Sequence, residues 1–216
     1  MIITQKKPIE EVMAMLGDAK KIALIGCGSC ATACATGGEK EIAELKSYLE
    51  SHGKQVVATG MSDYCCMNMM TRNIVKKLNA SNPDAIIAMS CGDGVQVVAK
   101  HANCAVYPSN NSMFLGESIK LGLFEEACHM CGNCVLGQTG GICPISRCAK
   151  SLVNGPCGGS RNGRCEVNPE NPCAWIEIYN KLVSLGQEEK IGITREDKGY
   201  ESVSYPRTIN IRGDRK

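Results

Sequence analysis

The sequence has few aromatic residues, few histidines and no long apolar run. Its 216 residues include two Phe, one Trp and three His, so a core must be built mainly from Ile, Leu, Val, Ala and Met. No Ser/His/Asp arrangement or carboxylate pair indicates catalysis. No segment approaches the roughly eighteen apolar residues of a membrane span. The net charge is +2 without a long basic run, which gives no reason to expect nucleic acid or a membrane surface as a partner.

Cysteine, by contrast, is abundant, and its 15 residues admit three explanations: disulfides, zinc or iron–sulfur clusters. The first residues, MIITQKKPIEEVMAM, contain no apolar run of signal-peptide length, so we expect a cytoplasmic protein. Thiols are kept reduced in the cytoplasm, where disulfides are rare. An odd number of cysteines also fits a disulfide framework poorly. The composition therefore favours metal binding.

Residues 1–112 are predicted to form an α/β domain. Thr36 and Glu39 have the spacing of a capping box, which predicts a helix that starts there and ends near Gly53. Residues 1–18 are expected to add a leading helix, with Ile9, Val12, Met13 and Leu16 on one face. The alternation of strands and helices predicts a small parallel, Rossmann-like sheet with helices on both faces. Strands are predicted at 20–26, 55–60, 83–90 and 104–108, and further helices at 65–81 and 92–102.

Six cysteines of this half follow the predicted strands. The carboxyl ends of parallel strands meet at one edge, where such folds bind ligands, so these thiols are expected to converge there. They are candidate ligands of a metal centre, either zinc or an iron–sulfur cluster. The set is Cys27, Cys30, Cys34, Cys65, Cys66 and Cys91. Cys104 begins the last strand at the opposite edge and is predicted to be a packed core thiol.

A dinucleotide site is a competing interpretation of the same loop. Gly26, Gly28 and Ala31 fit the pattern G-x-G-x-x-G/A, in which the last position tolerates Ala. No acidic residue stands at the end of the second strand, because Asp63 comes late. Three cysteines inside the presumptive phosphate loop favour a metal over a pyrophosphate.

The second half has a high density of cysteine and glycine and few apolar residues. Domains of this kind usually need a metal. The spacing C-x₂-C-x₂-C, starting at Cys128, places three thiols on one tight loop, which favours an iron–sulfur cluster over zinc. Eight cysteines match the needs of two [4Fe–4S] clusters, although the sequence does not show how they divide. They are Cys128, Cys131, Cys134, Cys143, Cys148, Cys157, Cys165 and Cys173. This half is therefore predicted to be a metal-stabilised, irregular domain.

Longer motifs in the same half carry a family resemblance. They are C-G-x-C, T-G-G-I-C-P, R-C, L-x-N-G-P-C-G-G, C-E-V and C-A-W, spread from Cys131 to Trp175. This segment resembles the cysteine-rich C-terminal family of methylenetetrahydrofolate reductase. The upstream segment GCGSCATACATGGEKE is similar to the small iron–sulfur and zinc subunit of the reductases found in acetogenic and other anaerobic bacteria.

The resemblance implies an accessory subunit without catalytic residues of its own. Electrons would pass from a donor module or ferredoxin to the flavin of a separate catalytic subunit, which reduces methylenetetrahydrofolate to methyltetrahydrofolate. Two [4Fe–4S] clusters are expected in the second half, and a cluster or zinc in the first. The alternative is a structural or assembly module of a redox complex without an electron relay. A third hypothesis, an enzyme with a reactive cysteine near Asp93 or His101, has little support.

Three parts of the chain are predicted. Residues 1–112 form the Rossmann-like metal-binding domain, and residues 113–186 form the cysteine-rich iron–sulfur domain, with a helix after Cys173. Residues 187–216 are charged and weakly patterned. They are interpreted as a solvated tail or as an arm that binds a partner subunit.

Overall fold

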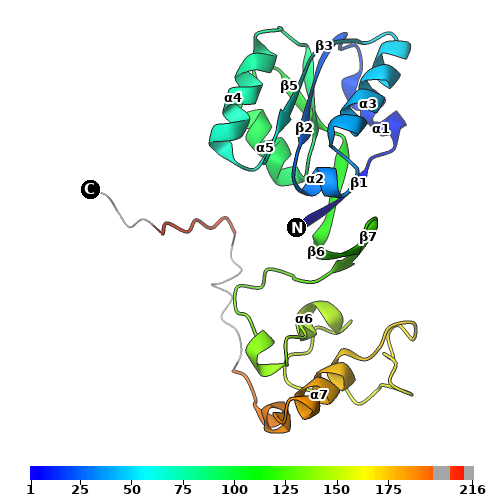
Figure 1. Ribbon diagram of the computed structural model, residues 1–216, viewed down its shortest axis with the longest axis vertical. Helices are drawn as coiled ribbons and strands as arrows, with labels where there is room; N and C mark the ends of the chain where they lie inside the picture. The colour runs from blue at the N-terminus through cyan, green and yellow to red at the C-terminus, as the bar shows by residue number, and fades with distance from the viewer. Residues whose placement is uncertain (197–204, 212–216) are drawn as a thin grey trace. The chain divides into compact units, whose positions relative to one another are not determined.

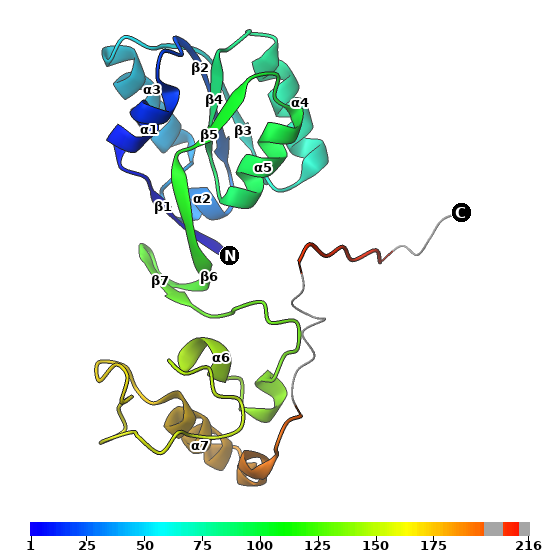
Figure 2. The same ribbon diagram turned by 180° about the vertical axis from the view of Figure 1, so that it is seen from behind.

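The computed structural model describes residues 1–196 and 205–211. The chain divides into two compact units, Met1–Glu125 and Glu126–Lys216, each of which is described on its own (Figures 1 and 2). Among the described residues, no helix combines the length and apolarity that crossing a bilayer requires.

A four-stranded parallel sheet forms the centre of the first unit, with the strand order β3-β2-β4-β5. The strands are β2 (Lys21–Cys27), β3 (Gln55–Ser62), β4 (Ala85–Met89) and β5 (Ala105–Pro108). Asp84 ties the amino ends of β2 and β4 together, because its Oδ2 accepts hydrogen bonds from the backbone N–H groups of Lys20 and Lys21 at 2.8 and 2.7 Å. The predicted parallel α/β sheet is confirmed.

Helices cover both faces of this sheet (Figure 1). On one face, α1 (Ile9–Leu16) and α3 (Glu39–Ser51) pack against Ile22 and Leu24 of β2. On the other face, α4 (Asn68–Asn79) and α5 (Gly92–His101) pack against Ala23 and Ile25. Successive side chains of a strand point to opposite faces, so one strand serves both cores. The short helix α2 (Cys30–Ala33) follows β2 directly.

A second sheet of three strands was not predicted from the sequence. Its order is β1-β6-β7, with β1 (Ile2–Lys6), β6 (Asn110–Lys120) and β7 (Leu123–Glu126). β1 pairs antiparallel with β6, so that Ile2 lies opposite Leu115. The expectation of a helix across residues 1–18 was therefore partly wrong, because the helix begins only at Ile9. β1 has only five residues and a partner more than a hundred positions away, so local periodicity did not reveal it.

The predicted capping box at Thr36 was also wrong. Helix α3 begins at Glu39 with Gly38 as its N-cap, and Glu41 Oε2 accepts the hydrogen bond of the Gly38 N–H at 2.9 Å. The Thr36 hydroxyl instead lies 3.2 Å from the backbone oxygen of Ala31, to which it donates. The capping pattern exists, but it starts two residues later than the sequence suggested.

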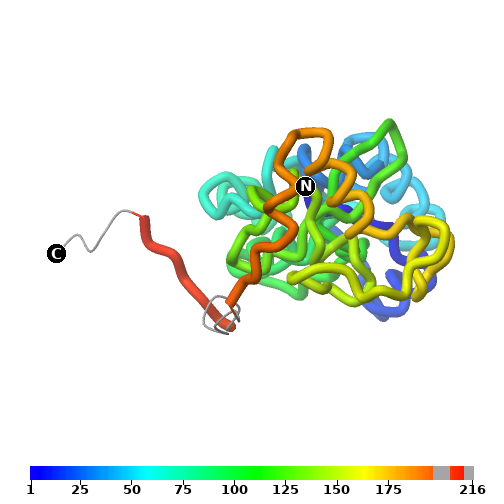
Figure 3. The backbone as a smooth tube through the Cα atoms, turned by 90° about the horizontal axis from the view of Figure 1, so that it is seen from below, coloured from blue at the N-terminus to red at the C-terminus, as the bar shows by residue number. Residues whose placement is uncertain are grey.

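The second unit has little regular structure. It contains the turns η1 (Leu136–Gln138) and η2 (Glu188–Gly192), and the helices α6 (Pro144–Arg147) and α7 (Ala174–Ser184). The helix predicted after Cys173 is thus present. Figure 3 traces the segment between α6 and α7, in yellow, as an irregular path. Trp175, Ile178 and Leu182 of α7 form its buried apolar cluster.

The three-part division predicted from the sequence remains a prediction, and β6 crosses its first boundary at residue 112 as one strand. The start of the predicted arm lies against the second unit. Asn154 and Arg195 exchange two hydrogen bonds through the Arg195 backbone, at 2.9 and 3.0 Å. Most of the rest of the arm, residues 197–204 and 212–216, lies outside the described residues.

Candidate metal centres

Four of the second unit's cysteines line a single cavity of about 20 Å³. They are Cys148, Cys157, Cys165 and Cys173, and Arg147, Lys150, Glu166 and Trp175 contribute to the same wall. The sequence left open how the eight cysteines divide. The structure brings these four together. A cavity of this size has room for about one water-sized occupant.

Local structure positions these four thiols. Cys148 ends α6, Cys173 begins α7, and both pack beside the cluster formed by Trp175 and its neighbours. The Cys165 N–H donates to the Asn171 oxygen at 3.0 Å, and the Cys173 N–H donates to the Gly163 oxygen at 2.8 Å. These bonds close the loop between the last two cysteines, so residues far apart in the chain reach one site.

Backbone N–H groups point at the sulfur atoms of this cavity. The Gly159 N–H donates to Cys157 Sγ at 3.4 Å. Hydrogen bonds from the backbone N–H groups of Asn168 and Val167 lower the pKa of the Cys165 thiol. Such bonds stabilise a thiolate, which is the form that binds metals. The backbone donors of this cavity therefore favour the thiolate form of its cysteines, which is the form that a metal would require.

A charged pair, which the sequence reading did not single out, borders the cavity. Lys150 and Glu166 form an ion pair, and Cys157 Sγ donates to Glu166 Oε1 at 3.3 Å. Lys150 first and Cys157 second lower the pKa of Glu166, and the bond with Glu166 raises the pKa of Lys150. Each residue stands close to a cysteine in the sequence, in C-A-K and C-E-V, and that proximity was the only available signal.

The other four cysteines of this unit differ in how far they are exposed to solvent. Cys128 and Cys134 are exposed, whereas Cys131 and Cys143 are partly buried. Cys128 Sγ accepts a hydrogen bond from the Met130 N–H at 3.3 Å, where Met130 adopts a φ of 51°. Cys143 precedes α6 as its N-cap. One thiol of this set therefore also has a backbone N–H directed at it.

In the first unit, Cys27 and Cys65 form a hydrogen-bonded pair at the carboxyl end of β2. Both are buried, and Cys65 Sγ lies 3.4 Å from the Gly26 oxygen. The hydrogen bond from Cys65 lowers the pKa of Cys27 to about 5, against the effect of burial, and N–H groups of Cys65, Ser29 and Ala31 add to the lowering. The same bond and burial raise the pKa of Cys65. The thiolate is therefore favoured at Cys27 rather than at Cys65.

Two more cysteines of the predicted set, Cys66 and Cys91, interact electrostatically with this pair. Burial is the main cause that raises the pKa values of Cys66 and Cys91, and the charge of Cys27 raises both further. Cys30 and Cys34 stand at the two ends of α2, and no interaction ties them to the pair. Four of the six predicted residues therefore interact electrostatically, but within the described part of the chain they do not form a metal-binding arrangement.

Cys104 packs beside the core of the α4–α5 face, as the sequence predicted. Gly26 of β2 and Gly37 before α3 are explained by close packing, since a Cβ at Gly26 would lie 2.5 Å from the Gly37 oxygen and one at Gly37 would overlap the Met89 oxygen. The first glycine of the G-x-G pattern thus has a packing explanation, whereas a Cβ at Gly28 would make only an ordinary contact with Asp63 at 3.4 Å. In residues 1–196 and 205–211, no three His, Cys, Asp or Glu side chains already stand in a metal-binding arrangement.

Comparison with known proteins gives one result. Residues 107–201 match the family described as "Methylene-tetrahydrofolate reductase C terminal". This range contains all eight cysteines of the second unit. No curated protein and no solved structure matches the chain. The resemblance carried by the cysteine motifs is confirmed over residues 107–201, the part of the chain that matches this family.

Proposed function

We propose that this chain is the iron–sulfur electron-transfer subunit of a methylenetetrahydrofolate reductase complex. It receives electrons from a donor module or ferredoxin and passes them to the flavin of a separate catalytic subunit, which reduces methylenetetrahydrofolate to methyltetrahydrofolate. One observation carries the proposal. Four cysteines from the family motifs, Cys148, Cys157, Cys165 and Cys173, line one cavity within the matched range.

These four cysteines would hold one centre, and the remaining cysteines of the unit, Cys128, Cys131, Cys134 and Cys143, would hold a second. When bound, [4Fe–4S] clusters accept and pass on single electrons with little change in geometry. Metal binding requires deprotonated thiols and releases their protons. Glu166 accepts the hydrogen bond of the Cys157 thiol, so it is placed to receive that proton.

The positive side chains at the cavity also have a role. Arg147 and Lys150 line it together with the four thiols. Four thiolates concentrate negative charge, and nearby cations and N–H donors offset that charge and tune a bound centre. Arg147 and Lys150 would therefore favour the reduced form, which carries one more negative charge.

A further centre, a cluster or zinc, would use the cysteines of the first unit. The hydrogen bond from Cys65 lowers the pKa of Cys27 to about 5, which favours the thiolate that a metal would bind. The charge of Cys27 contributes to the raised pKa values of Cys65, Cys66 and Cys91, which are therefore near it. A cation that replaced the shared proton of Cys27 and Cys65 would remove the cost of burying a charged sulfur.

Anaerobic purification with iron and sulfide analysis tests the proposal. We expect a brown protein with reversible reduction at biological potentials, and with about eight iron atoms, or about twelve if the first unit also holds a cluster. Cys165→Ser should lose about four of them. Cys104→Ser is the matched control, since Cys104 packs in the core, and should keep the parent's iron content. A colourless, zinc-loaded protein without reversible reduction would refute the relay.

A structural or assembly module is the second candidate, and one observation favours it. The cavity of about 20 Å³ is closer to the size of a single ion than to that of a four-iron cluster, which would need outward movement of the cysteines. Zinc is redox-inactive and commonly bound by four cysteines. A redox titration separates the two candidates, because a zinc site shows no reduction.

A further inference from the structure

A second cavity, of about 280 Å³, lies in the first unit and belongs to none of the cysteine sites. Its walls come from α1 and α3, from Met89 at the end of β4, from Ser109 just beyond β5 and from Lys6 at the end of β1. Cys27 and Cys65 belong instead to the core on the opposite face of the sheet. The cavity therefore requires an explanation of its own.

The position of the cavity is one that ligands favour. β2 and β4 are neighbours in the sheet, but the chain leaves β2 for α3 on one face and leaves β4 for α5 on the other. In open parallel sheets, ligands bind outside the carboxyl ends of two such strands. Met89 is the last residue of β4 and lines the cavity.

Most of the lining is apolar. Ile9, Val12, Leu45, Tyr48 and Met89 contribute side chains to it. The volume is near the lower end of the range for small-molecule sites, which are generally apolar with a few placed polar groups. A compact ring system fits these walls better than a sugar or a phosphate, because the two lysines of the lining, Lys6 and Lys7, already pair with Glu44 and Glu11.

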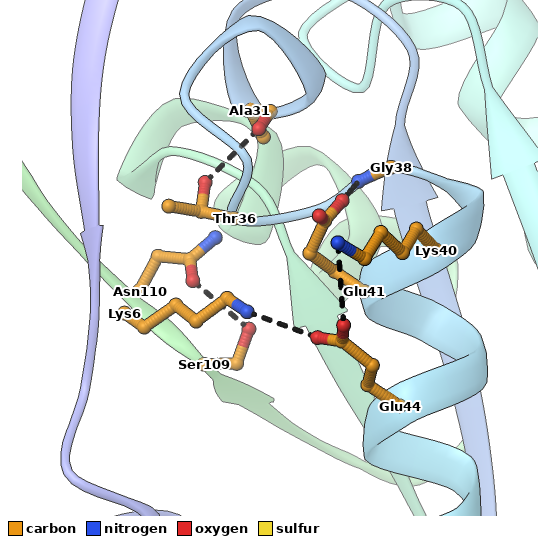
Figure 4. Close-up of polar contacts among 9 residues, drawn as sticks. All are labelled: Lys6, Ala31, Thr36, Gly38, Lys40, Glu41, Glu44, Ser109 and Asn110. Atoms are coloured by element: carbon orange, nitrogen blue, oxygen red, sulfur yellow. Dashed lines mark hydrogen bonds and ion pairs between the residues drawn. The ribbon is translucent and has the colours of Figure 1, made fainter. Parts of the chain in front are cut away.

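The buried polar groups of the cavity offer oxygen acceptors. Thr36 and Ser109 are 4% and 7% exposed. Their hydroxyl hydrogens are already used, since Thr36 donates to the Ala31 oxygen at 3.2 Å or to Thr4 Oγ1 at 2.7 Å, and Ser109 donates to Asn110 Oδ1 at 3.3 Å (Figure 4). At least one lone pair remains on each oxygen, so a ligand must supply the hydrogens.

Glu41 is the strongest of these acceptors and is only 7% exposed. One of its carboxylate oxygens accepts the Gly38 N–H at 2.9 Å (Figure 4). Within the described residues, the other oxygen has no hydrogen bond and the carboxylate has no ion-pair partner. The nearby cations Lys6 and Lys40 pair instead with the half-exposed Glu44, at 3.4 and 3.8 Å. A carboxylate buried in this way is stabilised by N–H donors.

We propose that this cavity binds a planar aromatic ligand with an amidine-type N–H edge, which aminated nitrogen heterocycles also present. The N–H groups would bind Glu41, with Ser109 or Thr36 as a further acceptor. The ring would lie among Val12, Leu45 and Met89. An amidine suits a carboxylate because it donates two parallel hydrogen bonds.

Isothermal titration calorimetry of the full chain with benzamidine tests this proposal. Benzoate is the matched ligand control, since it has a similar shape and the opposite charge. We expect saturable binding of benzamidine and none of benzoate. Glu41→Gln keeps an oxygen for the Gly38 N–H but removes the charge, and should weaken benzamidine binding at least about tenfold. Glu39→Gln, an exposed change in the same helical turn, should alter it less than about twofold.

Leu45→Trp is a second variant that would fill the cavity, and it should abolish benzamidine binding. Circular dichroism melting shows whether each variant is folded. Equal binding of benzoate, equal weakening by both glutamate variants, or no saturable binding at all would overturn the proposal. Iron content, measured on the same samples, reports on the cysteine sites alone, so failure here and failure of the electron relay are distinguishable.

Discussion

The two units differ in what holds them together. The first unit has two clusters of buried apolar side chains, one on each face of its parallel sheet, with Ile25, Leu24, Ile86 and Ile87 fully buried. The second unit has one cluster, in which Trp175, Ile178 and Leu182 are buried beside Cys148 and Cys173. Apolar burial near 25 cal/mol per Å² is the main favourable term in folding. The first unit therefore has a core on each face of its sheet, and we expect the second unit to depend on metal bound by its cysteines.

Chelation of bound metal should produce the largest difference between the units. We expect amide hydrogen exchange at α7 to accelerate at least about 100-fold after treatment with a strong chelator under reducing conditions, because metal-binding free energy is folding free energy in such domains. Exchange in β4 should change little. Retained protection of α7 in the chelated protein would show that the second unit folds without metal.

Large-to-small substitutions in the two cores test the same difference between the units, namely whether stability depends on bound metal. Ile87→Ala should destabilise the first unit by about 2–5 kcal/mol, since the side chain is fully buried between β-sheet and helices. This loss, measured by denaturant titration, should be the same before and after chelation. Ile178→Ala in the second unit should have an effect only when metal is bound. A loss after chelation for Ile178→Ala would contradict the dependence on metal.

One glycine in each unit allows the same chemical change to be compared. A Cβ at Gly37 would overlap the backbone oxygen of Met89, whereas one at Gly137 would meet nothing within 4 Å. Gly37→Ala should therefore cost about 1–3 kcal/mol or more, and Gly137→Ala less than about 0.5 kcal/mol. Thermal unfolding of both variants checks this. Similar midpoints for the two variants would refute the tight contact between the α2–α3 loop and β4.

The smallest expected effect concerns thiol reactivity. The hydrogen bond from Cys65 lowers the pKa of Cys27 to about 5, whereas burial raises the pKa of Cys91. In the chelated protein, alkylation of Cys27 should stay constant as pH falls from 8 to about 6 and decline only near 5, because the thiolate reacts. Alkylation of Cys91 should decline throughout this range. Mass spectrometry after iodoacetamide treatment measures both. Parallel profiles would exclude the thiolate at Cys27.

Much of the first unit could be predicted because its signals are local. Apolar runs such as KIALIG and AIIAM each predict a buried strand without reference to the rest of the chain. Their alternation with helical segments implies parallel pairing. Three strands were missed, β1, β6 and β7. Of these, β1 and β6 pair across more than a hundred residues, and none of the three has an apolar run of comparable length. Thr36 was misread because the local pattern did not show that its hydroxyl bonds to Ala31 and Thr4.

The sequence predicted which cysteines are candidate ligands, but it did not predict which of them lie together. The cysteine motifs indicated the family that residues 107–201 match, because the spacing of the cysteines is a property of the sequence. Which of them share a cavity depends on how α6, α7 and the loop between them fold back on one another. Lys150 and Glu166 were missed for the same reason. Their ion pair and the hydrogen bond from Cys157 to Glu166 join residues that are far apart in the sequence.

The amino-acid sequence by itself determined the α/β character of the first unit, the family that residues 107–201 match and the chemical type of the candidate ligands, because periodicity and motif spacing are properties of neighbouring residues. Tertiary structure alone decided that Cys148, Cys157, Cys165 and Cys173 line one cavity, that Cys65 lowers the pKa of Cys27, and that Glu41 lines a separate, mainly apolar cavity. Each of these depends on distances between residues that the chain keeps apart, and only packing brings them together.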